Sequence, residues 1–265
     1  MPPKRPEGVD RLPHAVEPVA PAKADPAELY AALDLGTNSC RMLIAQPKGN
    51  QFHVVDSFSK SVQLGLGLEA SGQLSNASMQ RTISALRICR NKIGKHDVRR
   101  MRLVATEACR RARNGAHFMK SVVQETGLNL EIIVPEEEAR LAVISCAPLV
   151  STRTEQLLVV DIGGGSTELV WIDLSRVPKI ERPRAIMRLH TGFKQDPASP
   201  FPAARVVDWI SVPLGVATLR DQFDDVSDDA ARFALMSWFF EENLAEFSPY
   251  EDEQTREGFQ IIGTS

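Results

Sequence analysis

Several features of secreted, membrane and nucleic-acid-binding proteins are missing from this sequence. The four cysteines are scattered, none forms a CxxC pair, and no histidine lies at the spacing of a metal finger. No apolar run reaches the ~20 residues of a membrane span, and the first residues lack the apolar segment of a secretory signal. The net charge of −3 leaves no general basic field for nucleic acid. We therefore expect a cytoplasmic protein with buried or semi-buried free thiols, no membrane contact and no specific nucleic acid binding.

What remains is the composition of a globular protein. The chain has 265 residues, of which 43% are hydrophobic and 25% are charged, and this suits one large domain or two of ordinary size. Residues 1–28 differ from the rest because they are rich in proline and charge. Such a segment cannot bury enough apolar surface to fold, so we expect a disordered tail there.

The most informative stretch is LLVVDIGGGSTELVW at 157–171. Two apolar runs on either side of a glycine turn predict a β-hairpin from a buried sheet. The glycines let several backbone N–H groups point at one anion and let a ligand approach the main chain closely. Asp161 and Glu168 flank the turn, and carboxylates beside a phosphate suit a hard cation such as Mg²⁺. The predicted phosphate-binding residues here are Gly163, Gly164, Gly165, Ser166 and Thr167.

A second stretch, YAALDLGTNSCRMLIA at 30–45, repeats this pattern. Asp34 ends an apolar strand, and the turn after it offers three donors for phosphate oxygens, Thr37, Asn38 and Ser39. Two such units, about 127 residues apart, suggest an internal duplication whose two loops face each other across a phosphate cleft. The competing interpretation is two unrelated hairpins in which the aspartates only form turns.

The remaining apolar patterns predict a mixed α/β order in each half. In the first half, a domain at 29–150, we expect strands at 52–57, 61–66, 101–106 and 130–134, and helices at 75–94, 115–126 and 135–147. In the second half, a domain at 151–265, we expect strands at 185–190, 206–212 and 258–263, helices at 216–223 and 227–247, and a surface loop at 191–204. The stripe Phe233, Met236, Phe240 and Leu244 predicts the buried face of the last helix. The second half has no counterpart of the last helix, strand and helix of the first, so we expect its domain to lack these closing elements.

Five motifs follow one another along the chain: ALDLGTNSCRMLIA at 32–45, VATEACRRARNG at 104–115, VPEEEARLAV at 134–143, VVDIGGGSTELV at 159–170 and VPLGVATLRDQF at 212–223. In this combination they resemble the exopolyphosphatase and guanosine pentaphosphate phosphatase (Ppx/GppA) family of the actin-like ATPase superfamily. The resemblance implies an α/β fold of duplicated ribonuclease-H-like domains with mixed sheets. It also implies a C-terminally truncated chain, since residues 263–265 match the start of the family's GTSGT-like phosphate loop.

The resemblance implies roles for individual residues as well. Glu138, which precedes Ala-Arg in EEAR, matches the general base, and Arg110 matches a polyphosphate ligand. Asp161 and Glu168 match the metal and phosphate-site carboxylates, and Asp34 joins them by its place at the end of an apolar strand.

The physical argument for Glu138 comes from its place at a helix start. A carboxylate in the first turn of a helix is held ionised by the helix dipole, and bound phosphate and desolvation would raise its pKa toward the working pH. The competing interpretation is that residues 136–138 are solvated residues of the helix start, as we expect for Glu136 and Glu137.

These observations favour a Mg²⁺-dependent phosphoanhydride hydrolase that removes the terminal phosphate of inorganic polyphosphate or the 5′ γ-phosphate of pppGpp. The motifs contain no residue that we can identify as reading a guanine base, so the choice between these substrates stays open. A sugar or acetate kinase of the same superfamily is one alternative, against which EEAR argues. A non-catalytic phosphate-binding remnant of such an enzyme is the other. A homodimer is one assembly that this interpretation allows.

Overall fold

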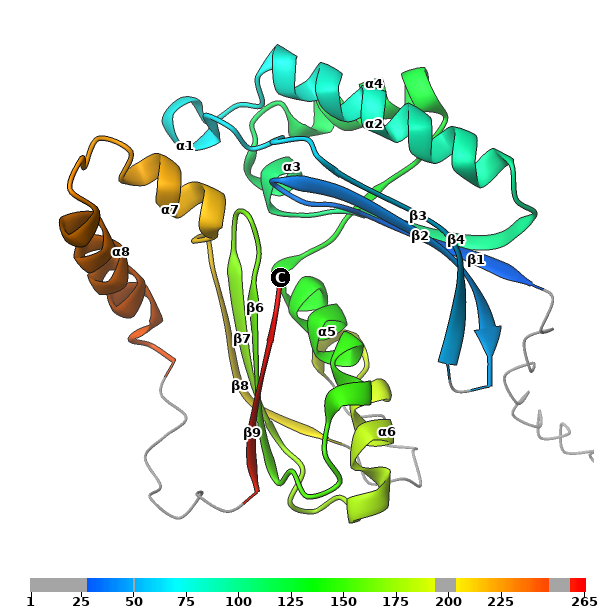
Figure 1. The fold of residues 1–265 in the computed structure, drawn as a ribbon, viewed down its shortest axis with the longest axis vertical. Coiled ribbons are helices and arrows are strands. Elements are labelled where there is room, and N and C mark those ends of the chain that lie inside the picture. The colour runs from blue at the N-terminus through cyan, green and yellow to red at the C-terminus, as the bar shows by residue number, and fades with distance from the viewer. Residues whose placement is uncertain (1–27, 50, 194–203, 248–257) are drawn as a thin grey trace, which may run out of the picture.

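Two α/β lobes, each built on one mixed sheet, form the computed structural model of the protein (Figure 1). The structure describes residues 28–49, 51–193, 204–247 and 258–265, so nearly all of the predicted tail lies outside the described residues. The first sheet has the strand order β3-β2-β1-β4-β5 and the second the order β8-β7-β6-β9. The α/β fold class with two mixed sheets that the sequence predicts is confirmed.

The first lobe packs two long helices against its sheet. Its strands are β1 (Leu29–Leu35), β2 (Ser39–Lys48), β3 (Gln51–Ser61), β4 (Val98–Ala105) and β5 (Glu131–Ile132), and its helices are α1 (Leu68–Ser71), α2 (Asn76–Gly94), α3 (Glu107–Arg111) and α4 (Gly115–Thr126). Leu33 and Leu35 of β1 are buried with Ile83 and Leu86 of α2 and Phe118 of α4. Residues two apart on a strand share one face, and residues three or four apart on a helix share one side, so these side chains meet in one core.

Local signals in the sequence set the ends of these helices. The Ser75 hydroxyl accepts a hydrogen bond from the Ser78 backbone N–H at the start of α2. Gly127 follows α4 with a φ of 70°, a conformation that glycine adopts without strain. The predicted helices at 75–94 and 115–126 are confirmed to within a residue.

The second lobe takes α5 (Pro135–Ser145) into its core, although α5 directly follows the first lobe in sequence. The other elements are β6 (Gln156–Ile162), β7 (Thr167–Asp173), β8 (Arg205–Val212), β9 (Phe259–Thr264), α6 (Arg182–Met187), α7 (Val216–Gln222), α8 (Asp229–Leu244) and the short 3-10 helices η1 (Ala147–Leu149), η2 (Lys179–Glu181) and η3 (Thr191–Phe193). Ala139 and Val143 of α5 pack with Val159 and Ile172 of the sheet. The first turn of α5 thereby lies between the two lobes (Figure 1).

Both sheets begin with the same arrangement. β1 is antiparallel to β2 and parallel to β4, while β6 is antiparallel to β7 and parallel to β9. Asp34 lies opposite Arg41 in the first hairpin, and Asp161 lies opposite Glu168 in the second. The two aspartates therefore occupy equivalent positions, as a duplication requires.

The strand predicted at 61–66 is wrong. β3 runs without a break to Ser61, and the residues after it turn away from the sheet. The backbone N–H groups of Val62 and Gln63 both donate to the Asn38 carbonyl, which draws this segment toward the turn of the first hairpin instead of into a new strand.

The strand predicted at 185–190 is also wrong, because residues 185–187 end the helix α6 and residues 188–190 form no strand. Arg182 at its start is buried and donates to the carbonyls of Val177 and Thr152. A proline follows in the first helical turn, where its missing N–H costs nothing. In the predicted surface loop at 191–204, residues 194–203 lie outside the described residues.

The last predicted helix is shorter and more exposed than expected. α8 begins after Asp228, whose carboxylate accepts from the Ala231 backbone N–H. None of its residues is buried in the described part of the chain, and the Phe233 side chain is 74% exposed. The apolar stripe was right as a sign of a helix, but it is not fully buried, since Met236, Phe240 and Leu244 are half-buried.

The fold also bears on two features of the sequence, its cysteines and its apolar helices. All four cysteines, Cys40, Cys89, Cys109 and Cys146, are buried and free, as predicted. Among the described residues, no helix has both the length and the apolar character needed to cross a bilayer.

Candidate active site between the lobes

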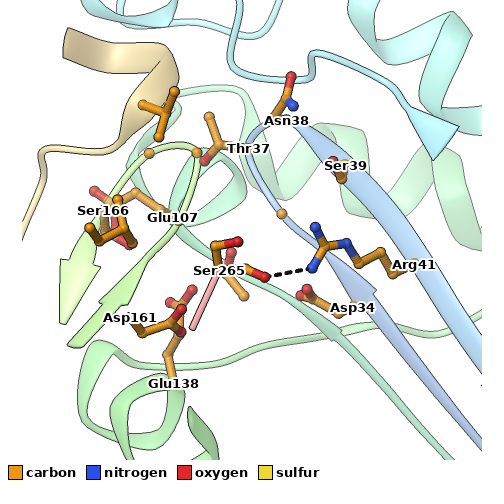
Figure 2. A pocket seen from close by; sticks show the side chains of 17 residues that line it. Asp34, Thr37, Asn38, Ser39, Arg41, Glu107, Glu138, Asp161, Ser166 and Ser265 are labelled. Atoms are coloured by element: carbon orange, nitrogen blue, oxygen red, sulfur yellow. Dashed lines mark hydrogen bonds between the residues drawn. The ribbon is translucent and has the colours of Figure 1, made fainter. Parts of the chain in front are cut away.

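A cleft of about 280 Å³ lies where the two hairpin turns and the start of α5 meet (Figure 2). It is lined from the first lobe by Asp34, Gly36, Thr37, Asn38, Ser39, Arg41, Thr106 and Glu107, and from α5 and the second lobe by Glu138, Asp161, Ile162, Gly163, Gly164, Gly165, Ser166, Val216 and Ser265. Most of the predicted site residues thus come together from segments far apart in the sequence.

The two turns are built alike. The Gly36 N–H donates to the Ser39 carbonyl at 2.9 Å, and the Gly163 N–H donates to the Ser166 carbonyl at 2.9 Å. Counted from the strand-ending aspartates, these bonds join equivalent positions. The close match of the two turns favours duplication over two unrelated hairpins.

The turns touch so closely that a side chain at Gly164 or Gly165 would press on the first turn. A Cβ on Gly165 would overlap the Thr37 hydroxyl and lie 3.0 Å from the Thr37 Cβ, and a Cβ on Gly164 would lie 3.0 Å from the Asn38 Cβ. The carbonyls of Gly163 and Gly164 accept hydrogen bonds from the start of α7, at 3.0 Å from Val216 N–H and 2.9 Å from Ala217 N–H. This leaves the amide N–H side of the turn for the cleft.

Thr37 supplies an unused polar group at this contact. Its side chain is 5% exposed, and its Oγ1 is a buried atom with no hydrogen-bond partner among the described residues. An unsatisfied buried hydroxyl costs about 1–3 kcal/mol. An oxygen-rich ligand in the cleft would provide the missing partner, so this atom is an argument for a bound anion.

Burial raises the pKa of every predicted carboxylate at this site. Burial raises the pKa of Glu138 to about 7, against the opposing effect of the Arg110 guanidinium. Burial also raises the pKa values of Asp34 and Asp161, while nearby Arg41 lowers both. Concentrated negative charge away from water is a setting in which a cation would be stabilised.

Glu138 occupies the first turn of α5 with its side chain 18% exposed, and Figure 2 shows it beside Asp161. The Arg110 Nη2 donates to Glu138 Oε2 at 3.2 Å. Glu138 is therefore not one of a solvated row of glutamates.

Its neighbour Glu137 was predicted to be solvated, and this prediction is wrong. The Glu137 carboxylate is buried and accepts hydrogen bonds from Arg140 at 2.7 Å and from Arg102 at 2.8 Å. The Arg140 guanidinium, more than any other group, lowers the pKa of Glu137 to about 2. Two adjacent glutamates thus differ in proton affinity because one faces arginines and the other faces the cleft.

Three predicted site residues do not line the cleft. The Thr167 hydroxyl donates to the Leu214 carbonyl at 2.6 Å. Glu168 is 2% exposed and accepts from the Ser211 hydroxyl at 2.7 Å; burial, followed by repulsion from Glu138, raises its pKa to about 7. Arg110 donates to the Ile133 carbonyl and to the carboxylates of Glu107 and Glu138.

The structure adds lining residues that the sequence analysis missed, above all Arg41 and Glu107. Arg41 Nη1 donates to the Ser265 carbonyl at 2.9 Å across the cleft (Figure 2). The sequence signal that could have identified Arg41 is the alternation of side chains along β2, which puts Ser39 and Arg41 on one face of the strand. Glu107 follows the last residues of β4 and begins the short helix α3.

The donor set of the cleft fits Mg²⁺ in one specific way. In the described ranges of the chain, no three or more His, Cys, Asp or Glu side chains are grouped as a metal site, so the protein does not provide a closed cage. Mg²⁺ keeps several waters and binds through one or two carboxylates together with phosphate oxygens. Asp34 and Asp161 suit this open mode.

Comparisons of the sequence and the fold with known proteins identify a family of phosphatases. A sequence model of the Ppx/GppA phosphatase family matches residues 43–264. A structure of the PPX-GPPA enzyme of Aquifex aeolicus is similar with 28% identity and a TM-score of 0.61, over 89% of this chain and 67% of that one; another structure of the same family member is covered over 65% of its length. An exopolyphosphatase from Cytophaga hutchinsonii is 22% identical with a TM-score of 0.70, over 90% of this chain and 67% of that one, and supports the fold alone. The chain therefore spans about two thirds of the length of these solved relatives.

Proposed function

Because the chain belongs to the Ppx/GppA phosphatase family, we propose that it hydrolyses the terminal phosphoanhydride bond of inorganic polyphosphate or of pppGpp, in the cytoplasm. The observation that carries the proposal is that the turns after Asp34 and Asp161, both suited to binding phosphate, line one cleft together with Glu138. The similarity to a PPX-GPPA enzyme supports the same chemistry.

The turns would hold the terminal phosphate. The Gly163 N–H already donates to the Ser166 carbonyl, so the backbone N–H groups of residues 164–166 are those that can donate to its oxygens, as in other glycine-rich anion nests. Thr37, Asn38 and Ser39 approach from the opposite lobe, and the Thr37 hydroxyl would gain the partner that it lacks. Donors from both lobes would fix the phosphorus in place and exclude bulk water.

Glu138 would act as the general base. With a pKa of about 7, it can accept a proton near neutral pH. A water between Glu138 and the phosphate would give its proton to the carboxylate while its oxygen attacks the terminal phosphorus. The bond from phosphorus to the bridging oxygen breaks, and the shortened chain leaves with that oxygen.

Asp34 and Asp161 are the proposed Mg²⁺ ligands, together with phosphate oxygens. When bound, the ion would offset the charge of the phosphates and of the leaving oxygen. Glu168 was predicted as a third metal carboxylate; because it is buried, does not line the cleft and accepts from Ser211, we propose that it keeps the turn in place.

Phosphate release and phosphate binding test the proposal together. Wild-type protein should release orthophosphate from polyphosphate or from pppGpp when Mg²⁺ is present, and Glu138→Gln should lose this activity while polyphosphate still binds. Glu136→Gln is the matched control, since Glu136 lies on the same helix turn and does not line the cleft. Binding without release by the wild type would indicate a phosphate-binding protein, and transfer to a sugar or acetate would indicate a kinase.

A further inference from the structure

Alternating charges lead from the protein surface to Glu138. Arg111 donates to both carboxylate oxygens of Glu69, at 2.6 and 3.0 Å, and its Nε lies 3.6 Å from Glu107 Oε1. Glu107 Oε2 accepts from Arg110 Nη2 at 2.5 Å, and the same nitrogen reaches Glu138 Oε2 at 3.2 Å. A single guanidinium thus separates Glu107 from the proposed base.

Glu107 is fixed in this place by the fold. It is 7% exposed, starts α3 directly after β4, and lines the cleft wall (Figure 2). Burial of a carboxylate is costly unless charged partners offset it, and Glu107 has two arginines as partners. Arg110 is also held at Nη1, which donates to the Ile133 carbonyl at 2.5 Å.

We propose that Glu107 is a positioning residue for the hydrolysis, because it holds Arg110 in the one orientation in which the guanidinium supports Glu138. This inference rests on the proposed function. Arg110 Nη2 is shared by two carboxylates and lies closer to Glu107. Without the Glu107 charge, the Ile133 carbonyl still holds Nη1, but Nη2 loses its nearer carboxylate and can turn fully onto Glu138 or toward the phosphate. Either movement would leave the base badly placed or too strongly paired to take a proton from water.

A double-mutant cycle tests whether Glu107 acts through Arg110. We expect Glu107→Gln to lower kcat by about 10-fold with KM for polyphosphate changed less than about twofold, as for a group that affects the transition state and not ground-state binding. In an Arg110→Gln background the same change should lower kcat by less than about twofold, because coupled residues are not additive. A wild-type kcat for Glu107→Gln, or full multiplication of the two effects, would overturn the proposal.

Glu69→Gln is the matched control for general charge loss. It removes the exposed outer carboxylate, which pairs with Arg111 and does not reach Arg110, so kcat should stay within about twofold of wild type. A loss as large as that of Glu107→Gln would show that any break in the charged chain matters and would contradict a specific role for Glu107.

A measurement without turnover keeps this inference separate from the proposed function. In ¹⁵N NMR of the arginine side chains, the Arg110 guanidinium protons should exchange slowly with water in wild type and in Glu69→Gln, and at least about tenfold faster in Glu107→Gln. If Glu107→Gln does not fold, Glu107→Asp should show an intermediate rate. Wild-type exchange rates in the Glu107 variant that folds would refute the positioning role, whether or not the wild type releases phosphate.

Discussion

Replacing Gly165 with alanine is a sharp test of the contact between the two turns. The added Cβ would overlap the Thr37 hydroxyl and lie 3.0 Å from Thr37 Cβ and 3.1 Å from Thr37 Cγ2. Rotation of the threonine side chain can move the hydroxyl and the methyl group, but it cannot move the Cβ. The first turn must therefore shift away from the second.

The size of the effect follows from this overlap. Forcing one extra methyl group into a close-packed contact costs about 1–3 kcal/mol, which corresponds to a loss of about 5- to 150-fold in an equilibrium constant. We expect Gly165→Ala to weaken polyphosphate binding by a factor in this range, because Thr37 and the nest move apart. Some of the cost should also appear as a lower Tm.

Isothermal titration with polyphosphate and thermal unfolding measure the two effects. Gly94→Ala is the matched control, since its Cβ would meet only the Arg90 guanidinium at 3.7 Å at the end of α2. There alanine should be neutral or stabilising by up to ~1 kcal/mol. Wild-type affinity for Gly165→Ala would refute the argument that the two turns form one phosphate cradle.

Three further predictions concern the charged groups. The hydrolysis rate should rise with pH up to about 7 and level off above it, because burial raises the pKa of Glu138 to that value and only the ionised form can take a proton; a kcat-against-pH profile with no acid limb near 7 would contradict this. Glu137→Gln should destabilise the fold by about 3 kcal/mol, since folding lowers the pKa of Glu137 from 4.5 to about 2. Because the pKa of this carboxylate is lowered, its stabilisation is present above pH 4.5 and is lost as the pH falls toward 2. The free energies of urea unfolding of wild type and variant should therefore converge at low pH. Asp161→Asn should raise the Mg²⁺ concentration for half-maximal activity by about tenfold or more, and an unchanged Mg²⁺ titration would remove Asp161 from the metal site.

The parts of the fold that were predictable are those specified by neighbouring residues. The two hairpins follow from apolar runs that end in aspartate and a glycine turn, and α2 and α4 follow from their spacing and end signals. The errors at 61–66 and 185–190 have a different origin. At 61–66, hydrogen bonds to the distant Asn38 carbonyl override a local apolar pattern. At 185–190, the hydrogen bond from the buried Arg182 to the Thr152 carbonyl, 30 residues away, has the same effect.

The candidate site likewise contains residues that the sequence predicts and residues that only contacts between distant segments bring there. Asp34 and Asp161 could be predicted because each ends an apolar strand, and Glu138 because EEAR resembles a motif of the family; the structure brings all three to one cleft. Arg41 and Glu107 could not, since the approach of the lobes decides which strand face and which helix start border the cleft. Thr167, Glu168 and Arg110 have suitable chemistry, yet partners within the protein hold their side chains away from the cleft lining.

The most direct test of the central claim is hydrolysis of polyphosphate in water enriched in ¹⁸O. If a water activated by Glu138 attacks the terminal phosphorus, each orthophosphate released by the wild type should carry one ¹⁸O, the remaining chain should carry none, and Glu138→Gln should reduce the rate by ~10²–10⁴. Label in the remaining chain, or labelled orthophosphate from Glu138→Gln at the wild-type rate, would contradict the claim.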